Sequence, residues 1–147
     1  RLHATVFDAP EVIPIAREHV THAALLDRID FRDGDFNESD LGNGYDLVLV
    51  SNVIHMLGPD RNHRLIHRCY DAMAPGGLLI IKDFFPDSER SGPPYALLFA
   101  LHMLVNTGEG DTYVPAEVEA WTREAGFARA ELRPLTAKSA LFLTHKP

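Results

Sequence analysis

Hydrophobic residues along this chain are grouped in two ways, as short continuous runs and as stripes at helical spacing. The runs are rich in Val, Ile, Leu and Phe and are bounded by turn-forming residues, a pattern typical of strands in a parallel sheet that is covered on both faces. They occupy residues 3–8, 29–36, 45–53 and 78–85. The stripes repeat every three or four residues and predict helices over about 11–20, 60–73, 93–107 and 115–126.

Proline and glycine mark where several of these helices begin and end. Pro115 begins the last helix and Gly126 follows it, while the sequence APGG ends the helix that precedes the fourth strand. The stripe of that earlier helix includes the single cysteine, Cys69, which we therefore expect to be a small core residue. Segment 93–107 is apolar nearly all round, which predicts either a buried helix or the wall of a pocket.

The chain closes with two strand-like segments, residues 127–135 and 139–146. Too few residues join them for a parallel crossover, so they are expected to pair as an antiparallel hairpin. Strands that alternate with helices over the preceding residues predict an α/β fold. The expected architecture is a Rossmann-like sheet that is mostly parallel, with a C-terminal antiparallel hairpin, in a single domain that covers residues 1–147.

Composition narrows the classes of protein that this chain can represent. The 147 residues include 14 basic and 21 acidic side chains, giving a net charge of −7, which disfavours a nucleic-acid partner. No apolar run approaches the roughly 20 residues of a membrane span, and no leader-like segment is recognisable. One cysteine excludes an internal disulfide and a cysteine-built metal site, and a cytoplasmic location is expected.

Polar residues follow the four expected parallel strands near the points where they end. These residues are Asp8, Asp35, His55 and Asp83. Because open α/β sheets bind ligands outside the carboxyl ends of their strands, we expect the four side chains to project towards one rim. Asp8 could hold two ribose hydroxyls or could cap the helix that follows, and position alone does not separate the two. Asp35, in the sequence DGDF, could accept from an adenine amino group beside Phe36 or could form an Asx turn.

His55 follows an apolar strand, and a lone histidine in that position is more often structural than catalytic. Asp83 favours chemistry, because its carboxylate can accept the imidazole N–H and leave the other nitrogen as a base. The remaining histidines form no cluster with metal-ligand spacing; His63 and His67 share one helix face, without a third ligand. No metal site is expected.

The ordered motifs of this chain resemble the catalytic domain of the S-adenosyl-L-methionine (SAM)-dependent O-methyltransferases of the plant caffeate/flavonoid and bacterial polyketide type. The resemblance is carried, in family order and over nearly the whole chain, by VFDAP, GDF, YDLVLVSNVIH, YDAMAPGGLLIIKDF, HMLVNTGEG and WTREAGF. It implies that the protein transfers a methyl group from SAM to a hydroxyl of an aromatic or polyketide-like acceptor.

The resemblance also implies roles for individual residues. Asp8 matches the residue that holds the SAM ribose, Asp35 with Phe36 matches the adenine site, and Ser51 faces the methionine end. His55 matches the general base and Asp83 the acidic residue that orients it. Met103 matches a position lining the pocket of a hydrophobic small-molecule acceptor, and we expect three further residues to line the same pocket: Met56, Phe99 and Asn106.

The chain also departs from the family pattern. Met56 stands where many members have Asp after the catalytic histidine, and Thr112 occupies the place of a second carboxylate, with Glu109 and Asp111 nearby. A glycine-rich GxGxG loop after a first strand is absent, and Gly42-Asn43-Gly44 precedes a strand and cannot replace it. We therefore expect a catalytic-domain fragment that lacks its first βα unit. The family's N-terminal domain, through which the full-length protein is expected to form a homodimer, is absent too.

Two other functions remain open from the sequence. Some relatives use the same cofactor site for hydroxylation or decarboxylation, although retention of His55 favours methylation. Alternatively, the chain is catalytically silent and binds a partner chain, since a sheet edge left without its neighbouring strand favours such pairing.

Overall fold

The computed structural model describes residues 2–147 and confirms the expected α/β fold. The chain forms two compact units; the first ends at Gly42 and the second comprises Asn43–Pro147. Each unit contains its own hydrogen-bonded sheet, so the strands form two sheets instead of the single expected one. Within the described residues, no helix combines the length and the apolar character that crossing a membrane requires.

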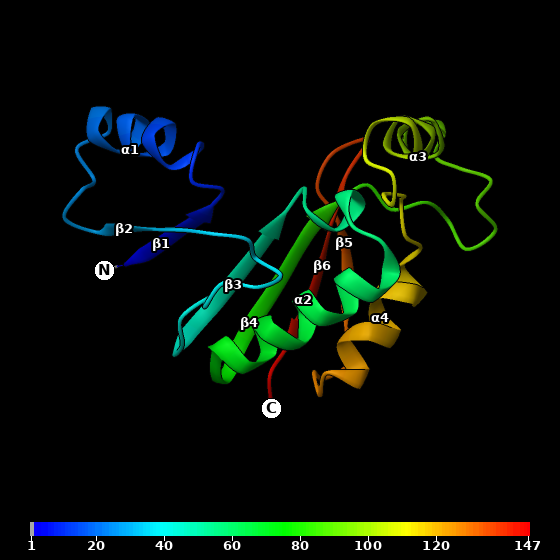
Figure 1. The fold of residues 1–147 in the computed structure, drawn as a ribbon. Coiled ribbons are helices and arrows are strands. Elements are labelled where there is room, and N and C mark those ends of the chain that lie inside the picture. The colour runs from blue at the N-terminus through cyan, green and yellow to red at the C-terminus, as the bar shows by residue number, and fades with distance from the viewer. Residues whose placement is uncertain (1) are drawn as a thin grey trace. The chain divides into compact units, whose positions relative to one another are not determined.

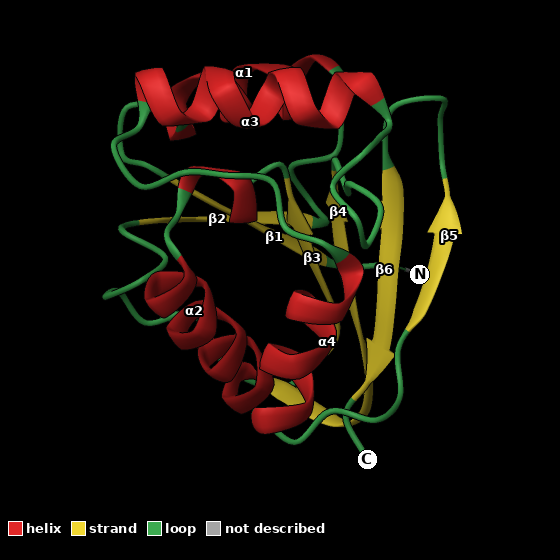
Figure 2. Cartoon of the chain, turned by 90° about the vertical axis from the view of Figure 1, so that its right-hand side faces the viewer, coloured by secondary structure: helices red, strands yellow, loops and turns green. Residues whose placement is uncertain are grey.

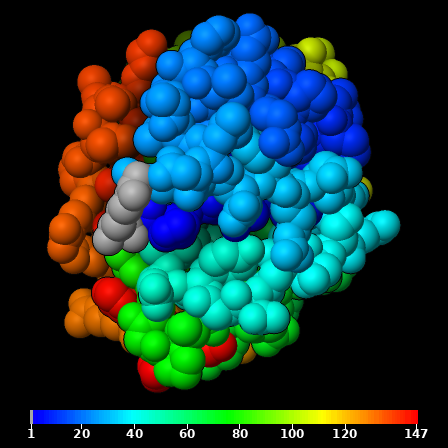
Figure 3. Space-filling view, turned by 90° about the vertical axis from the view of Figure 1, so that its left-hand side faces the viewer, coloured from blue at the N-terminus to red at the C-terminus, as the bar shows by residue number. Residues whose placement is uncertain are grey.

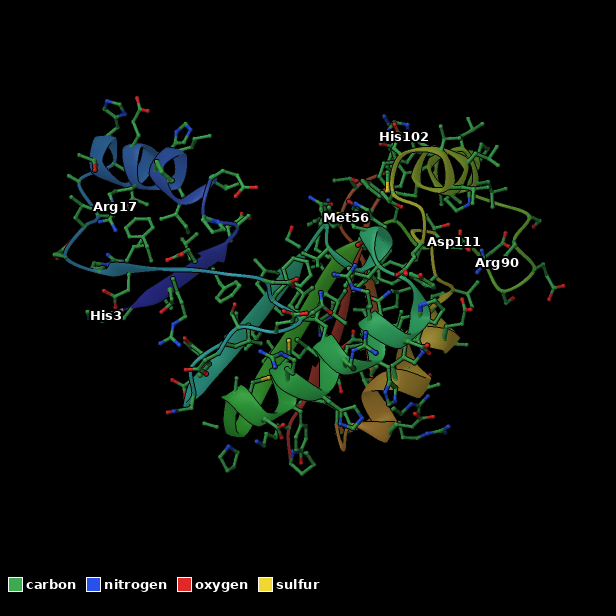
Figure 4. The ribbon with its side chains drawn as sticks, in the orientation of Figure 1. His3, Arg17, Met56, Arg90, His102 and Asp111 are labelled. Atoms are coloured by element: carbon green, nitrogen blue, oxygen red, sulfur yellow. The ribbon has the colours of Figure 1, made fainter. Side chains whose placement is uncertain are left out.

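The first unit is a βαβ unit. Strands β1 (Ala4–Asp8) and β2 (Ile29–Asp33) pair in parallel, and helix α1 (Ile13–His22) connects them. The helix begins two residues later than predicted, with Pro14 in its first turn. The guanidinium of Arg17, which is labelled in Figure 4, lies 4.3 Å from the centre of the Phe31 ring, and α1 buries no residue completely. The helix surface is drawn in blue in Figure 3.

The second unit is built on a four-stranded mixed sheet with strand order β3-β4-β6-β5 (Figure 1). Strand β3 (Tyr45–Ser51) pairs in parallel with β4 (Met73–Asp83). Strands β5 (Glu131–Pro134) and β6 (Ala140–His145) form the predicted antiparallel hairpin, and β6 is also antiparallel to β4. Only β6 therefore runs against the other strands of this sheet.

Four helical segments complete the second unit. They are η1 (Ile54–Met56), α2 (Pro59–Ala72), α3 (Pro94–Asn106) and α4 (Pro115–Glu124). Helices α2 and α4 lie on the same face of the sheet (Figure 2). Their apolar stripes meet the side chains of alternate strand residues, so the core between the layers contains Leu65, Ile66, Cys69, Leu79, Ile81, Val118 and Phe142. Cys69 is 2% exposed, as its position in the stripe predicted.

The other face of this sheet is partly exposed in the described residues. On β3, Leu47 and Leu49 are 48% and 57% exposed and point away from the face on which Val50 is buried. Helices α2 and α4 both pack on one face of this sheet, so coverage of its second face stays a prediction. Near-continuous apolar runs fit a strand with two apolar faces but do not show what covers the second.

Helix α3 lies at the end of the sheet where β3 and β4 finish (Figure 1). Only Ala96 and Met103 are buried, whereas four apolar residues are 60–82% exposed: Leu98, Leu101, Leu104 and Val105. The expectation of a buried helix is wrong within the described residues, because α3 packs through one narrow face. The alternative, that α3 forms a pocket wall, stays open.

Strand β4 begins five residues earlier than predicted, directly after α2. Gly76 has a φ of +79°, a conformation that glycine adopts without strain, and its N–H donates to the carbonyl of Lys146. The Lys146 ammonium donates in turn to the carbonyls of Tyr70 (2.7 Å) and Met73 (2.8 Å). Lys146, which follows β6, therefore donates to two carbonyls at the junction of α2 and β4.

Candidate active site

The imidazole of His55 and the carboxylate of Asp83 form a buried hydrogen-bonded pair. Nδ1 of His55 lies 2.7 Å from Oδ1 of Asp83, and the residues are 7% and 1% exposed. The same Oδ1 accepts the backbone N–H of Phe84 at 2.8 Å. Oδ2 is also buried and has no hydrogen-bond partner among residues 2–147. The structure thus brings together the two residues that the sequence predicted as a pair.

The direction of this hydrogen bond assigns the imidazole proton. A carboxylate only accepts hydrogen bonds, so Nδ1 of His55 must carry the proton that it shares with Asp83. In the neutral ring Nε2 then holds the free lone pair, which is the arrangement that a general base needs. The carboxylate would also stabilise the positive charge that the ring acquires when Nε2 takes up a proton.

The ends of two adjacent parallel strands position the pair. Asp83 is the last residue of β4, and β3 ends at Ser51, which is paired with Lys82. Asn52 then adopts a φ of +58°, which asparagine tolerates better than most residues, and turns the chain into η1. The Lys82 ammonium donates to Oδ1 of Asn52 at 2.7 Å and so fixes this turn to the neighbouring strand.

Aromatic rings line the pair on the side of α3. The Phe99 ring meets His55 edge-on with 4.8 Å between ring centres, and Phe84 lies 6.0 Å from His55. Phe84 packs against Phe99 at 4.7 Å and against Tyr95 at 5.0 Å. Figure 4 labels Met56 on η1 and His102 on α3, both near the end of the sheet where the pair lies. The surroundings of the imidazole are therefore apolar and aromatic.

The turn that carries His55 is held by residues that the sequence interpretation did not select. The Asn62 amide, on α2, donates to the carbonyls of Ile54 (2.9 Å) and Leu57 (3.1 Å). The Tyr113 hydroxyl also donates to the Leu57 carbonyl. Asn62 occupies the buried stripe that continues with Leu65, Ile66 and Cys69, so a polar residue at an apolar position was the signal that could have found it.

Gly110 packs directly against the His55 turn. A Cβ at this position would overlap the carbonyl oxygen of His55 and the Thr107 hydroxyl. The Thr107 hydroxyl accepts the Gly110 N–H at 2.8 Å and donates to the carbonyl of Met103. This loop thus joins the end of α3 to the backbone of the candidate base.

The other predicted acceptor-site residues occupy different environments. Phe99 contacts His55 directly, Met103 is 7% exposed, and Met56 is 48% exposed. Asn106 is exposed, and its amide folds back to donate to the carbonyl of His102 at 2.7 Å. Roles in acceptor binding stay predictions for all four.

The residues at and near the place of the family's second carboxylate contact groups other than His55. Thr112 is 1% exposed and its hydroxyl donates to the carbonyl of Ala96. Asp111 pairs with Arg90, with 3.4 Å between Oδ2 and Nη1 (both labelled in Figure 4), and the Glu109 side chain lies beside Gly58. Asp83 is the carboxylate that contacts His55.

The residues predicted to bind cofactor lie at the end of a strand or within three residues after it. In the first unit, the exposed Asp8 ends β1 and accepts the N–H of Ala9 at 2.8 Å. Helix α1 begins after Val12 without a side-chain cap, so the reading of Asp8 as its N-cap is wrong. Asp35 Oδ1 accepts the N–H of Asn37 at 2.8 Å, which is the Asx turn, and Phe36 is partly buried. In the second unit, Ser51 is exposed at the end of β3.

Comparison with known proteins supports the class of protein that this fold and site indicate. Residues 1–128 match a protein family described as the O-methyltransferase domain. The tetracenomycin polyketide synthesis 8-O-methyl transferase TcmO of Streptomyces glaucescens is 33% identical over 146 residues, covering 99% of this chain and 43% of TcmO.

Two solved structures are similar to this chain throughout its length. Human N-acetylserotonin methyltransferase in complex with SAM has 31% identity and a TM-score of 0.86, over 98% of this chain and 40% of that one. An O-methyltransferase family 2 protein from Planctomyces limnophilus in complex with apigenin has 29% identity and a TM-score of 0.92, over 99% and 43%.

The chain is a member of the O-methyltransferase domain family, which confirms the resemblance. It spans less than half the length of the relatives to which it is compared.

Proposed function

We propose that the complete protein containing this chain transfers a methyl group from SAM to a hydroxyl of an aromatic or polyketide-like small molecule, with His55 as the general base. The observation that carries this proposal is the buried hydrogen bond of 2.7 Å between His55 and Asp83. It leaves Nε2 as the basic atom, in a setting of aromatic rings at the end of a parallel strand pair.

His55 and Asp83 have different roles in activating the acceptor hydroxyl. His55 takes the proton from the acceptor hydroxyl at Nε2, which makes the oxygen a better nucleophile. Asp83 holds the ring in the required tautomer and stabilises the imidazolium. General-base assistance of this kind typically contributes about 10²–10⁴-fold to the rate.

An aromatic acceptor agrees with what surrounds the base. Phe84 and Phe99 present apolar ring surface beside His55, and such surface favours burial of another ring. TcmO is named for a polyketide pathway, and the relative from Planctomyces limnophilus was solved with apigenin. Both names are consistent with a ring-bearing acceptor for the present protein.

The residues of the chain fit SAM by the chemistry of their side chains. Asp8 presents an exposed carboxylate at the carboxyl end of β1, which suits two ribose hydroxyls, and its part in capping α1 is excluded. Asp35 and Phe36 would hold the adenine, and Ser51 would face the methionine end. When bound, SAM supplies an electrophilic methyl group on a positively charged sulfur. The human relative was solved with SAM.

The test is to compare the complete protein with its His55→Ala variant. Methyl transfer from labelled SAM to a hydroxynaphthoate and to N-acetylserotonin would be measured together with SAM affinity by calorimetry. We expect kcat to fall by about 10²–10⁴-fold with an unchanged SAM Kd. His67→Ala is the matched control, since His67 lies on α2 with its ring 4.7 Å from the ring of His63. Unchanged kcat in His55→Ala would contradict the assigned base.

The methylated product also separates this function from the related reactions. A gain of one methyl group in the product supports methyl transfer, whereas loss of carbon dioxide or gain of oxygen would identify decarboxylation or hydroxylation. A homodimer and a cytoplasmic location stay predictions for the complete protein.

A further inference from the structure

We propose that Asn62 is a positioning residue for catalysis, which holds the His55 turn so that the imidazole remains aligned with Asp83. The inference rests on the proposed role of His55 as general base. Asn62 donates to the backbone carbonyls of Ile54 and Leu57, which flank the base, and not to the His55 side chain.

Few hydrogen bonds within η1 hold the turn that carries His55. Segment η1 contains three residues, and its backbone hydrogen bonds are Met56 N–H to the Val53 carbonyl at 2.9 Å and Leu57 N–H to the Ile54 carbonyl at 3.3 Å. Short 3₁₀ turns have poorer hydrogen-bond geometry than α-helices. External contacts must therefore fix the direction in which His55 projects.

Asn62 supplies two such contacts from one rigid amide group. Its Nδ2 donates to the carbonyls of Ile54 and Leu57, one on either side of the His55–Met56 pair. The side chain is 0% exposed, and it is anchored on α2, whose neighbouring stripe residues Leu65 and Ile66 are also buried. The amide is thus fixed to the hydrophobic core, and the turn is fixed to the amide.

Burial of a polar amide in an apolar stripe needs a reason, because an amide is favourable there only when it is hydrogen-bonded. Nδ2 is satisfied by the two carbonyls, whereas Oδ1 is buried with no partner among residues 2–147. The hydrogen bonds of the Asn62 side chain are therefore made by its Nδ2 end. The Tyr113 hydroxyl is a second side-chain donor at the Leu57 carbonyl, and Gly110 packs against the carbonyl oxygen of His55.

The effect of Asn62 on catalysis must therefore depend on His55. Asn62→Leu keeps a side chain of similar shape and removes both donors. We expect kcat to fall by at least about 10-fold, because a misplacement of 1 Å can cost about 10²-fold, while the SAM Kd remains unchanged. In the His55→Ala background, the same substitution should change kcat by less than about twofold, since there is no base left to misalign.

The experiment is this double-mutant cycle in the complete protein, with hydroxynaphthoate as acceptor. Thr144→Val is the control for lost stability, since the hydroxyl of the buried Thr144 donates to the carbonyl of Ala128, away from η1. It should lower the melting temperature and leave kcat unchanged. A loss of equal size in both His55 backgrounds, or no loss when His55 is present, would overturn the proposal and make Asn62 purely structural.

A spectroscopic measurement separates this proposal from the proposed function. The ¹⁵N and ¹H signals of the His55 ring, assigned by their absence in His55→Ala, report whether Nδ1 donates to Asp83. Asn62→Leu, or Asn62→Ser if the leucine variant does not fold, should reduce the downfield shift of the Nδ1 proton that this hydrogen bond causes. An unchanged ring spectrum would overturn the positioning role, even if His55→Ala showed that His55 is not the base.

Discussion

Nδ1 of His55 donates to Oδ1 of Asp83 across 2.7 Å, although 28 positions separate the two residues in the sequence. His55 follows β3 and Asp83 is the last residue of β4, so the parallel pairing of these neighbouring strands brings the two residues together. The contact has a chemical consequence, because it fixes which nitrogen of the imidazole carries the proton.

Replacing Asp83 with Asn should abolish most of the activity while preserving the fold. The amide has nearly the same shape, but its NH₂ group can face Nδ1 of His55 and move the ring proton to Nε2, where it blocks proton uptake. We expect kcat to fall by about 10²-fold or more with unchanged SAM affinity. Asp71→Asn, an exposed position on α2, is the control. Activity within twofold of wild type would show that Asp83 does not set the tautomer.

Replacing Gly110 with Ala should displace the base. The added Cβ would overlap the carbonyl oxygen of His55, and the backbone there is held by Asn62 and cannot move freely. We expect kcat to fall by about 10-fold or more. Gly108→Ala is a matched control in the same loop: at a φ of +77° it is strained by about 1–2 kcal/mol, but its Cβ would meet nothing within 4 Å. Equal kcat losses in the two variants would contradict this explanation.

Lys146 should contribute to stability through the end of α2. Its ammonium donates to the carbonyls of Tyr70 and Met73 and lies 4.4 Å from the centre of the Tyr70 ring. Lys146→Met keeps most of the aliphatic chain and leaves both carbonyls without this donor, so we expect a loss of about 1–3 kcal/mol in the free energy of unfolding. Lys138→Met, at an exposed position, should cost less than about 1 kcal/mol. Denaturant unfolding would measure both; equal losses would refute the capping role.

Cys69 should be unreactive in the folded protein at moderately alkaline pH. Burial raises the pKa of its thiol from 9.0 to about 12, so the folded state keeps a proton that the unfolded state releases. The stabilising contribution of the neutral thiol is therefore complete below pH 9 and declines as the pH rises towards 12. Between pH 8 and 10, labelling of the native Cys69 peptide by a disulfide reagent should follow unfolding. Labelling of the native protein as fast as that of the unfolded protein would contradict this.

Local sequence patterns were sufficient to predict most of the elements. Apolar runs identified the strands, and Pro115 with Gly126 marked the last helix, which spans Pro115–Glu124. The short connection between the last two strands predicted their antiparallel pairing, which is confirmed. These features depend on periodicity and turn chemistry within a few residues, and both are visible in the sequence itself. The ordered family motifs added the class of protein, which is confirmed by the match over residues 1–128.

Side-chain partners, in contrast, were decided by the tertiary structure. The sequence allowed Asp8 to be a helix cap, but α1 begins four residues too late for that contact. It predicted that α3 is apolar, but it did not show that Leu98 and Val105 would be exposed while Met103 is buried. It also gave no reason to join Asn62 to the His55 turn. The physical reason is that a hydrogen bond such as that of Asn62 is set by the packing of α2 on the sheet, which brings the amide within 2.9 Å of the Ile54 carbonyl.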